Sequence, residues 1–181
     1  MATEDLQHRS LLDEQHVRPE KLNYRTLGCS VLCSVVVAFL TFFLMEQVGK
    51  DTSTATQAIS TVNAPAAIGP YSQAILYGEN MLYVAGQIGL NPTTGTVVGG
   101  GITNETTQAL ENIVAILDAA GTSTSKVLIC RVYLTDINDF TAMNDVYSTY
   151  FTSAAPPARA AFQVGALPLE AQVEIQCDAG V

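Results

Sequence analysis

Arg159 is the residue of this chain whose surroundings most clearly suggest chemistry. It follows Pro156, Pro157 and Ala158 and precedes a run of apolar residues. A guanidinium group does not lose its proton in proteins, so a cation at the start of an apolar strand needs an anionic partner. Two partners are compatible with the sequence. One is the carboxylate of Glu174 in a structural salt bridge, and the other is the carboxylate of a small ligand held by two parallel hydrogen bonds.

The residues missing from the C-terminal part exclude several classes of site. Both histidines, His8 and His16, precede residue 51, which excludes Ser-His and Cys-His nucleophile pairs and zinc sites with imidazole ligands there. Gly99–Gly101 is not followed by lysine, so it is no phosphate-binding loop of the GxxxxGK type. Cys130 and Cys177 fall in two different predicted strands without a C-x-x-C motif, and neither zinc nor a disulfide framework is indicated. We expect no metal and no cofactor.

The charge of this part of the chain excludes another class of partner. Residues 51–181 contain 11 acidic residues but only three cations, Lys126, Arg131 and Arg159. Nucleic-acid binding is dominated by cations on phosphates, so this balance predicts no nucleic-acid partner.

Hydrophobic periodicity gives the elements that must position Arg159. Two short β-rich runs at 74–77 and 81–88 are separated by a turn at Gly78, and a helix is predicted for 103–120 with Gly121 as its stop. The remaining predicted elements are a strand at 127–134, a helix at 138–151, and strands at 160–164 and 173–179. Each helix has one apolar stripe to bury. The pattern predicts an α+β fold with two helices on one face of a mixed sheet.

The N-terminal part contains a long segment without charged residues. Leu27 to Met45 is a run of 19 residues without a charge, which is about the length of a membrane-spanning helix. A buried core helix and a cleavable signal peptide are the alternatives, but no amphipathic pattern or cleavage site supports them. We therefore predict a polar tail (1–26), a transmembrane helix (27–45), a linker (46–58) and a folded domain (59–181). Whether Cys29 and Cys33 are acylated stays open.

The charges around this run predict its orientation. Arg18, Lys21 and Arg25 precede it, while only Lys50 closely follows it. The positive-inside rule then predicts a single-pass membrane protein with a cytoplasmic N-terminus. The alternative location is the cytosol or the mitochondrion.

Four segments of the domain resemble one known family. They are Asn63–Ala74 (NAPAAIGPYSQA), Val84–Gly95 (VAGQIGLNPTTG), Asp136–Phe151 (DINDFTAMNDVYSTYF) and Pro157–Ile175 (PARAAFQVGALPLEAQVEI). Together they are similar to the reactive intermediate deaminase (Rid) family, closest to its RidA branch. The likeness covers residues 59–181 nearly end to end, and residues 1–58 lie outside it.

The resemblance implies a chorismate-mutase-like fold assembled as a homotrimer with three clefts between subunits. It also implies hydrolysis of small 2-imino acids, such as 2-iminobutanoate and 2-iminopropanoate, to 2-oxo acids and ammonia. An imine is already electrophilic, so the protein need only hold its carboxylate and place a water. Two other classes stay in view. One is a non-catalytic module of the same fold that binds carboxylate metabolites or proteins, and the other is a ribonuclease or translation inhibitor.

The resemblance also implies roles for particular residues. Arg159 would clamp the carboxylate, Glu174 would position or activate water, and Tyr71 would close the pocket. The implied substrate-binding positions are Gly86, Asn144, Ala161 and Phe162. The chain departs from the family at Ala85, where a serine is common, and the missing hydroxyl predicts weaker turnover or an altered preference.

Overall fold

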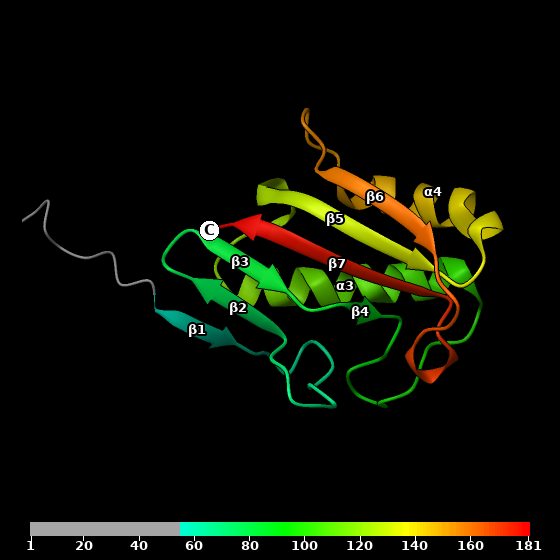
Figure 1. Ribbon diagram of the computed structural model, residues 1–181, viewed down its shortest axis with the longest axis horizontal. Helices are drawn as coiled ribbons and strands as arrows, with labels where there is room; N and C mark the ends of the chain where they lie inside the picture. The colour runs from blue at the N-terminus through cyan, green and yellow to red at the C-terminus, as the bar shows by residue number, and fades with distance from the viewer. Residues whose placement is uncertain (1–54) are drawn as a thin grey trace, which may run out of the picture. The chain divides into compact units, whose positions relative to one another are not determined.

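One mixed sheet, covered on one face by two helices, makes up the part of the chain that the structure describes. The computed structural model describes residues 55–181. Helices α3 (Ile102–Ala119) and α4 (Phe140–Tyr150) pack side by side against the same face of the sheet (Figure 1). The strands are β1 (Thr56–Ile59), β2 (Ala74–Tyr77), β3 (Met81–Val84), β4 (Gln87–Ile88), β5 (Val127–Leu134), β6 (Ala158–Gln163) and β7 (Val173–Gly180).

The order of the strands differs from their order in the sequence. Across the sheet they run β1-β2-β3-β7-β5-β6, and the short strand β4 also pairs with β7. Strands β5 and β6 are parallel, because α4 connects them over the helix-covered face, and the other pairs are antiparallel. The last strand in sequence, β7, thus lies in the middle, and β6 forms one edge.

The helices form where the sequence predicts them. Leu110, Ile113 and Leu117 recur at three- and four-residue spacing, and all three are buried against the sheet. Gly121 ends α3 in a left-handed conformation with φ of 77°, which glycine adopts without steric cost. Three short 3-10 turns complete the connections, at Thr124–Lys126, Ile137–Asp139 and Pro168–Glu170.

Alternation along the strands assigns each side chain to one face of the sheet. In β5, Cys130, Val132 and Leu134 are buried beneath the helices, whereas Arg131 and Tyr133 face the opposite side. We call the face of the sheet that points away from the helices the open face. Arg131 donates a hydrogen bond of 3.0 Å to the Asp178 carboxylate there and forms an ion pair with it.

A disulfide connects two central strands. Cys130 of β5 and Cys177 of β7 are direct partners in the antiparallel register, and a disulfide joins them in the buried core. The interpretation that no disulfide is indicated was wrong. The two cysteines are 47 residues apart, and only the pairing of β5 with β7 brings them together.

The α+β part of the predicted fold class agrees with the structure, but its membrane part needs correction. Residues 27–45, where a transmembrane helix was predicted, lie outside the described residues, and no helix within 55–181 is long and apolar enough to cross a membrane. The fold class that the structure supports is therefore the α+β domain alone. The membrane partner and the single-pass location rested on that helix and are withdrawn with it. Strand β1 begins at Thr56, inside the segment interpreted as a linker.

Candidate functional site

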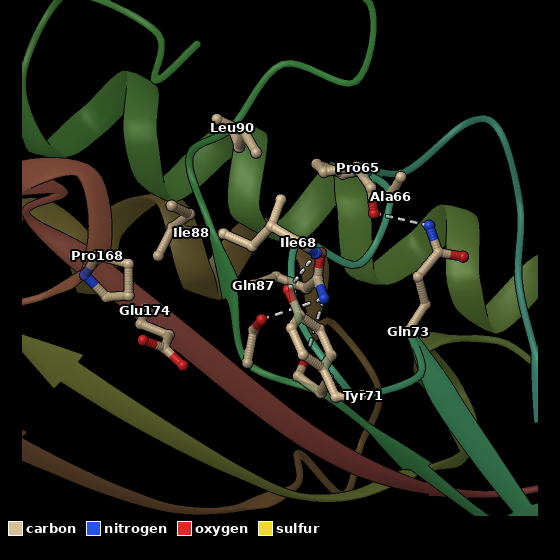
Figure 2. Close-up of a pocket in the computed structure, with 12 residues that line it drawn as sticks. Pro65, Ala66, Ile68, Tyr71, Gln73, Gln87, Ile88, Leu90, Pro168 and Glu174 are labelled. Atoms are coloured by element: carbon tan, nitrogen blue, oxygen red, sulfur yellow. Dashed lines mark hydrogen bonds between the residues drawn. The ribbon is translucent and has the colours of Figure 1, made fainter. Parts of the chain in front are cut away.

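A pocket of about 350 Å³ opens between β4, the start of β7 and the loop that follows β1. Figure 2 shows Tyr71, Gln87 and Glu174 around this space. The pocket wall is mostly apolar, with a few polar groups, as is usual for small-molecule sites. The residues that line it are Pro65, Ala66, Ile68, Tyr71, Gln73, Ala85, Gly86, Gln87, Ile88, Leu90, Pro168 and Glu174.

Glu174 is the ionisable acid of this pocket. It lies on β7 opposite Ile88 of β4, and it alternates with the core residues Val173 and Ile175, so its side chain leaves the core on the open face. Partial burial removes water from the carboxylate and raises the pKa of Glu174 above its ordinary value of 4.5. A carboxyl group with a raised pKa can take up and release a proton closer to neutral pH.

Gly86 allows the carboxylate of Glu174 to approach the backbone. A Cβ atom at position 86 would overlap the Oε1 atom of Glu174 and would lie 2.8 Å from its Cδ. Any residue other than glycine would therefore displace the carboxyl group. The sequence predicted Gly86 as a substrate-binding position, and the structure places it at the same pocket as Glu174 and Tyr71.

A loop held by the buried side chain of Gln73 carries Tyr71. The Gln73 amide nitrogen donates to the carbonyl oxygens of Thr61, Ala64 and Pro65 at 3.0, 3.1 and 2.7 Å, and its oxygen accepts from the Thr61 amide at 2.6 Å. Tyr71 is half exposed, and its hydroxyl accepts a hydrogen bond of 3.3 Å from the Ile68 amide. Gln73 thus holds the loop from which Tyr71 reaches the pocket.

A second buried amide fixes the opposite wall of the pocket. Asn112 of α3 donates to the carbonyl oxygens of Ile88 and Leu90 at 3.2 and 2.9 Å. These bonds attach β4 and the residues after it to the helix. They matter because β4 pairs with β7 over only two residues. The wall next to Glu174 is therefore part of the rigid core.

Arg159 lies elsewhere, at the start of the edge strand β6. Its Nη1 donates a hydrogen bond of 2.9 Å to Oδ1 of Asn144 on α4. Its guanidinium carbon is 4.6 Å from the ring centroid of Tyr147 and 5.5 Å from that of Phe140, both also on α4. We call these four residues, Phe140, Asn144, Tyr147 and Arg159, the arginine cluster.

The arginine cluster and the Glu174 pocket lie on opposite faces of the sheet. Arg159 is the register partner of the buried Cys130 and therefore shares the helix-covered face. Glu174 is the partner of Tyr133 on the open face, and β5 separates β6 from β7. Within one chain, Arg159 and Glu174 do not meet. The structural salt bridge between them, one of the two alternatives considered for Arg159, is therefore absent from the described residues.

The two remaining predicted positions divide in the same way. Ala161 pairs with the buried Val132, so it lies on the face of Arg159. Phe162 pairs with Tyr133 and lies on the face of Glu174, where its side chain is 56% exposed. The structure thus brings Arg159, Asn144 and Ala161 to one side, and Tyr71, Gly86, Glu174 and Phe162 to the other.

Phe140, Tyr147 and Gln73 were not among the site residues predicted from the sequence. Phe140 and Tyr147 fall in the helix predicted at 138–151, where an apolar residue is most simply part of the stripe that the helix buries. Their spacing around Asn144, four residues on one side and three on the other, places all three on one helix face and was the available signal. No local pattern marks Gln73, because its partners depend on the path of the loop.

Comparison with known proteins identifies the family. The family model described as endoribonuclease L-PSP matches residues 61–181. The chain belongs to the L-PSP family. The goat protein named 2-iminobutanoate/2-iminopropanoate deaminase is 54% identical over 118 residues, which are 65% of this chain and 85% of that protein. The human protein of the same name is 49% identical over 120 residues, or 66% of this chain and 86% of that protein.

Solved structures of similar proteins agree with this family assignment. YyfA from Yersinia pestis, described as a conserved Rid family protein, is 46% identical with a TM-score of 0.68, over 70% of this chain and all of that chain. Escherichia coli TdcF, solved with bound serine, is 37% identical with a TM-score of 0.66, over 69% of this chain and 98% of that chain. The resemblance of the four motifs to the Rid family is thereby confirmed.

Proposed function

We propose that this chain is an imine hydrolase that converts 2-imino acids such as 2-iminobutanoate and 2-iminopropanoate to 2-oxo acids and ammonia. The observation that carries the proposal is the carboxyl group of Glu174, which has a raised pKa and lies in a small, mostly apolar pocket. Relatives about 50% identical are named 2-iminobutanoate/2-iminopropanoate deaminase, in agreement with this chemistry.

The complete site takes its two halves from neighbouring copies of the chain. Arg159 and Glu174 lie on opposite faces of one sheet, so a single chain offers a substrate either the cation or the carboxyl group but not both. Exposed β6, at the edge of the sheet, can present Arg159 to the Glu174 pocket of a second copy. The homotrimer with clefts between subunits, implied by the family resemblance, stays a prediction that fits this division.

Arg159 holds the substrate carboxylate in this scheme. The bond to Asn144 uses Nη1, and within the described residues the Nε and Nη2 groups are left to donate to a carboxylate. Escherichia coli TdcF was solved with bound serine, which supports an amino-acid-like ligand for this chain. When Arg159 binds the carboxylate, the imine carbon is fixed relative to the pocket wall.

Glu174 handles the protons of the reaction. Its carboxylate accepts a proton from a water molecule as the water oxygen bonds to the imine carbon, and it passes this proton to the imine nitrogen, which gives a tetrahedral carbinolamine. The carboxylate then accepts the proton of the carbinolamine hydroxyl group and passes it to the amine nitrogen. The C–N bond breaks, and ammonia leaves as the C=O bond of the 2-oxo acid forms. The raised pKa of Glu174 suits both steps, because the same group must accept and then donate a proton.

Two features bear on the rival functions. Ala85 lines the pocket without a hydroxyl group, so the ordering of water falls to Glu174 and to the backbone. The word endoribonuclease in the family description does not fit this domain, since residues 51–181 contain no histidine and carry 11 acidic residues against three cations. Imine hydrolysis needs neither a histidine nor a basic surface.

The test is the hydrolysis of 2-iminobutanoate generated in place by a threonine dehydratase, followed as formation of 2-oxobutanoate. We expect the chain to accelerate the reaction above the spontaneous rate. Arg159→Lys keeps the charge but loses the planar fork, so it should lower kcat/KM by about 10- to 100-fold while the melting temperature changes little. Lys126→Arg, a swap at an exposed turn, is the control. A wild-type rate equal to that of buffer alone would reject the proposed function.

A further inference from the structure

One face of α4 forms a support for the side chain of Arg159. Phe140, Asn144 and Tyr147 follow one another at spacings of four and three residues, so their side chains lie along one stripe of the helix. The guanidinium carbon is nearest the ring of Tyr147, at 4.6 Å from its centroid, against 5.5 Å for Phe140. Both distances are within the range of cation–π contacts.

Tyr147 is the rigid member of this stripe. Its side chain is 5% exposed, whereas that of Phe140 is 36% exposed. The Tyr147 ring also packs against Phe151, with 4.5 Å between the ring centroids. Because the core holds the ring on one side, the ring offers Arg159 a fixed surface for the cation–π contact.

The hydroxyl group of Tyr147 does not explain why a tyrosine ring lies there. It is buried and has no hydrogen-bond partner among the described residues. Burial raises the pKa of Tyr147 to about 12, against the smaller opposing effect of the Arg159 charge, so the phenol stays neutral. The interaction with Arg159 is therefore made by the face of the ring and not by a phenolate.

We propose that Tyr147 is a positioning residue for the proposed imine hydrolysis, one that holds the guanidinium plane of Arg159 in the orientation that binds the substrate carboxylate. The inference rests on the proposed function, because it names how the carboxylate clamp is held. A long arginine side chain loses much rotamer freedom when it binds a ligand. Tyr147 and the Asn144 bond fix the guanidinium before substrate arrives, and the outer donors remain available.

A purely structural role makes a different prediction. If Tyr147 only fills the core, its replacement lowers stability, and the guanidinium of Arg159 behaves as before in the molecules that stay folded. If Tyr147 positions Arg159, loss of the aromatic face frees the guanidinium even in folded molecules. Tyr147→Phe keeps the ring and removes only the unpartnered hydroxyl, so it is the matched control for Tyr147→Leu.

The deciding measurement is NMR of the Arg159 side chain in the full-length chain. The Nε–Hε signal is assigned by its absence in Arg159→Lys. Wild type and Tyr147→Phe should show a high order parameter at Nε and ring-current shifts of the Arg159 methylene protons. In Tyr147→Leu the order parameter should fall to below about 0.6, and the shifts should move toward unstructured values. If Tyr147→Leu does not fold, Tyr147→Met fills a similar space without an aromatic face.

Kinetics give the second readout. With 2-iminobutanoate made in place, Tyr147→Leu should raise KM about tenfold, and Tyr147→Phe should stay within about twofold of wild type. Unchanged Arg159 dynamics in Tyr147→Leu would overturn the positioning role. A failure of the proposed function looks different, since wild type itself would then not hydrolyse the imine while the NMR comparison would still report on Arg159.

Discussion

Gly86 and Glu174 are in such close contact that a methyl group at position 86 would overlap the Glu174 carboxylate. The backbone of one pocket wall therefore sets the position of the acid on the other. Gly86→Ala should push the carboxyl group out of place and lower kcat/KM for imine hydrolysis by about 100-fold, since small misplacements of catalytic groups are costly. Gly99→Ala is the control, because a Cβ at Gly99 would meet no atom within 4 Å. Equal rates for the two variants would contradict this role of Gly86.

The raised pKa of Glu174 makes a prediction about stability. The folded chain binds this proton more tightly than the unfolded chain, so the contribution of Glu174 to stability is greatest below its unfolded pKa and is lost as pH rises through the folded pKa. Glu174→Gln removes the ionisation. Thermal melts should show the variant more stable than wild type near pH 8, with a difference that shrinks toward about pH 4.

Glu79→Gln, on an exposed turn, is the control for these melts. It should follow the wild-type curve across the same range. A constant difference between Glu174→Gln and wild type at every pH would show that burial of the carboxylate does not set its pKa. Hydrolysis by Glu174→Gln should be strongly reduced at every pH at which its stability is measured, since glutamine cannot accept the proton.

A mixing experiment tests whether the two halves of the site come from different copies. Arg159→Ala and Glu174→Gln chains should each be inactive alone. Refolded together in equal amounts, they should recover about one quarter of the wild-type activity, because one site in four then combines an intact Arg159 with an intact Glu174. Activity is measured with 2-iminobutanoate made in place. A mixture as inactive as its components would place both residues in one chain.

The disulfide should contribute strongly to stability. Joining Cys130 to Cys177, 47 residues apart, restricts the unfolded chain by about 4 kcal/mol on the loop-entropy estimate. Cys130→Ala/Cys177→Ala should therefore unfold at a lower urea concentration than the oxidised wild type. Wild type treated with reductant while unfolded is the matched comparison, since it lacks the bond but keeps both side chains. Identical unfolding midpoints for oxidised and reduced wild type would refute the estimate.

The sequence allowed the individual helices and strands to be predicted, but not which strands pair with one another in the sheet. The stripe of Leu110, Ile113 and Leu117 predicted a helix at 103–120, and α3 spans 102–119. The insertion of β7 between β3 and β5 follows from long-range pairing, which no local period contains. For this reason the Cys130–Cys177 bond was missed.

The candidate site shows the same limit. Motif resemblance selected Arg159, Glu174, Tyr71 and Gly86, and the structure places the last three at one pocket. That Arg159 lies on the other face depends on its register with Cys130 across a parallel strand pair. The contact between Tyr147 and the guanidinium group of Arg159 was not predicted, because an aromatic residue in the apolar stripe of a helix is most simply interpreted as a core residue.

The loop held by Gln73 has a consequence for how substrate preference can change. Arg159 lies on strand β6 and contacts side chains of helix α4, whereas Ile68 and Tyr71 lie on a loop that one buried amide fixes at its base. Substitutions at residues 66–71 can reshape the pocket without disturbing the ladder of the sheet or the carboxylate clamp. Selection for new side-chain specificity should therefore enrich changes in this loop while Gln73 stays constant. Under the proposed function, Arg159 would bind the carboxylate that all 2-imino acids share, and this loop would contact the group that distinguishes them.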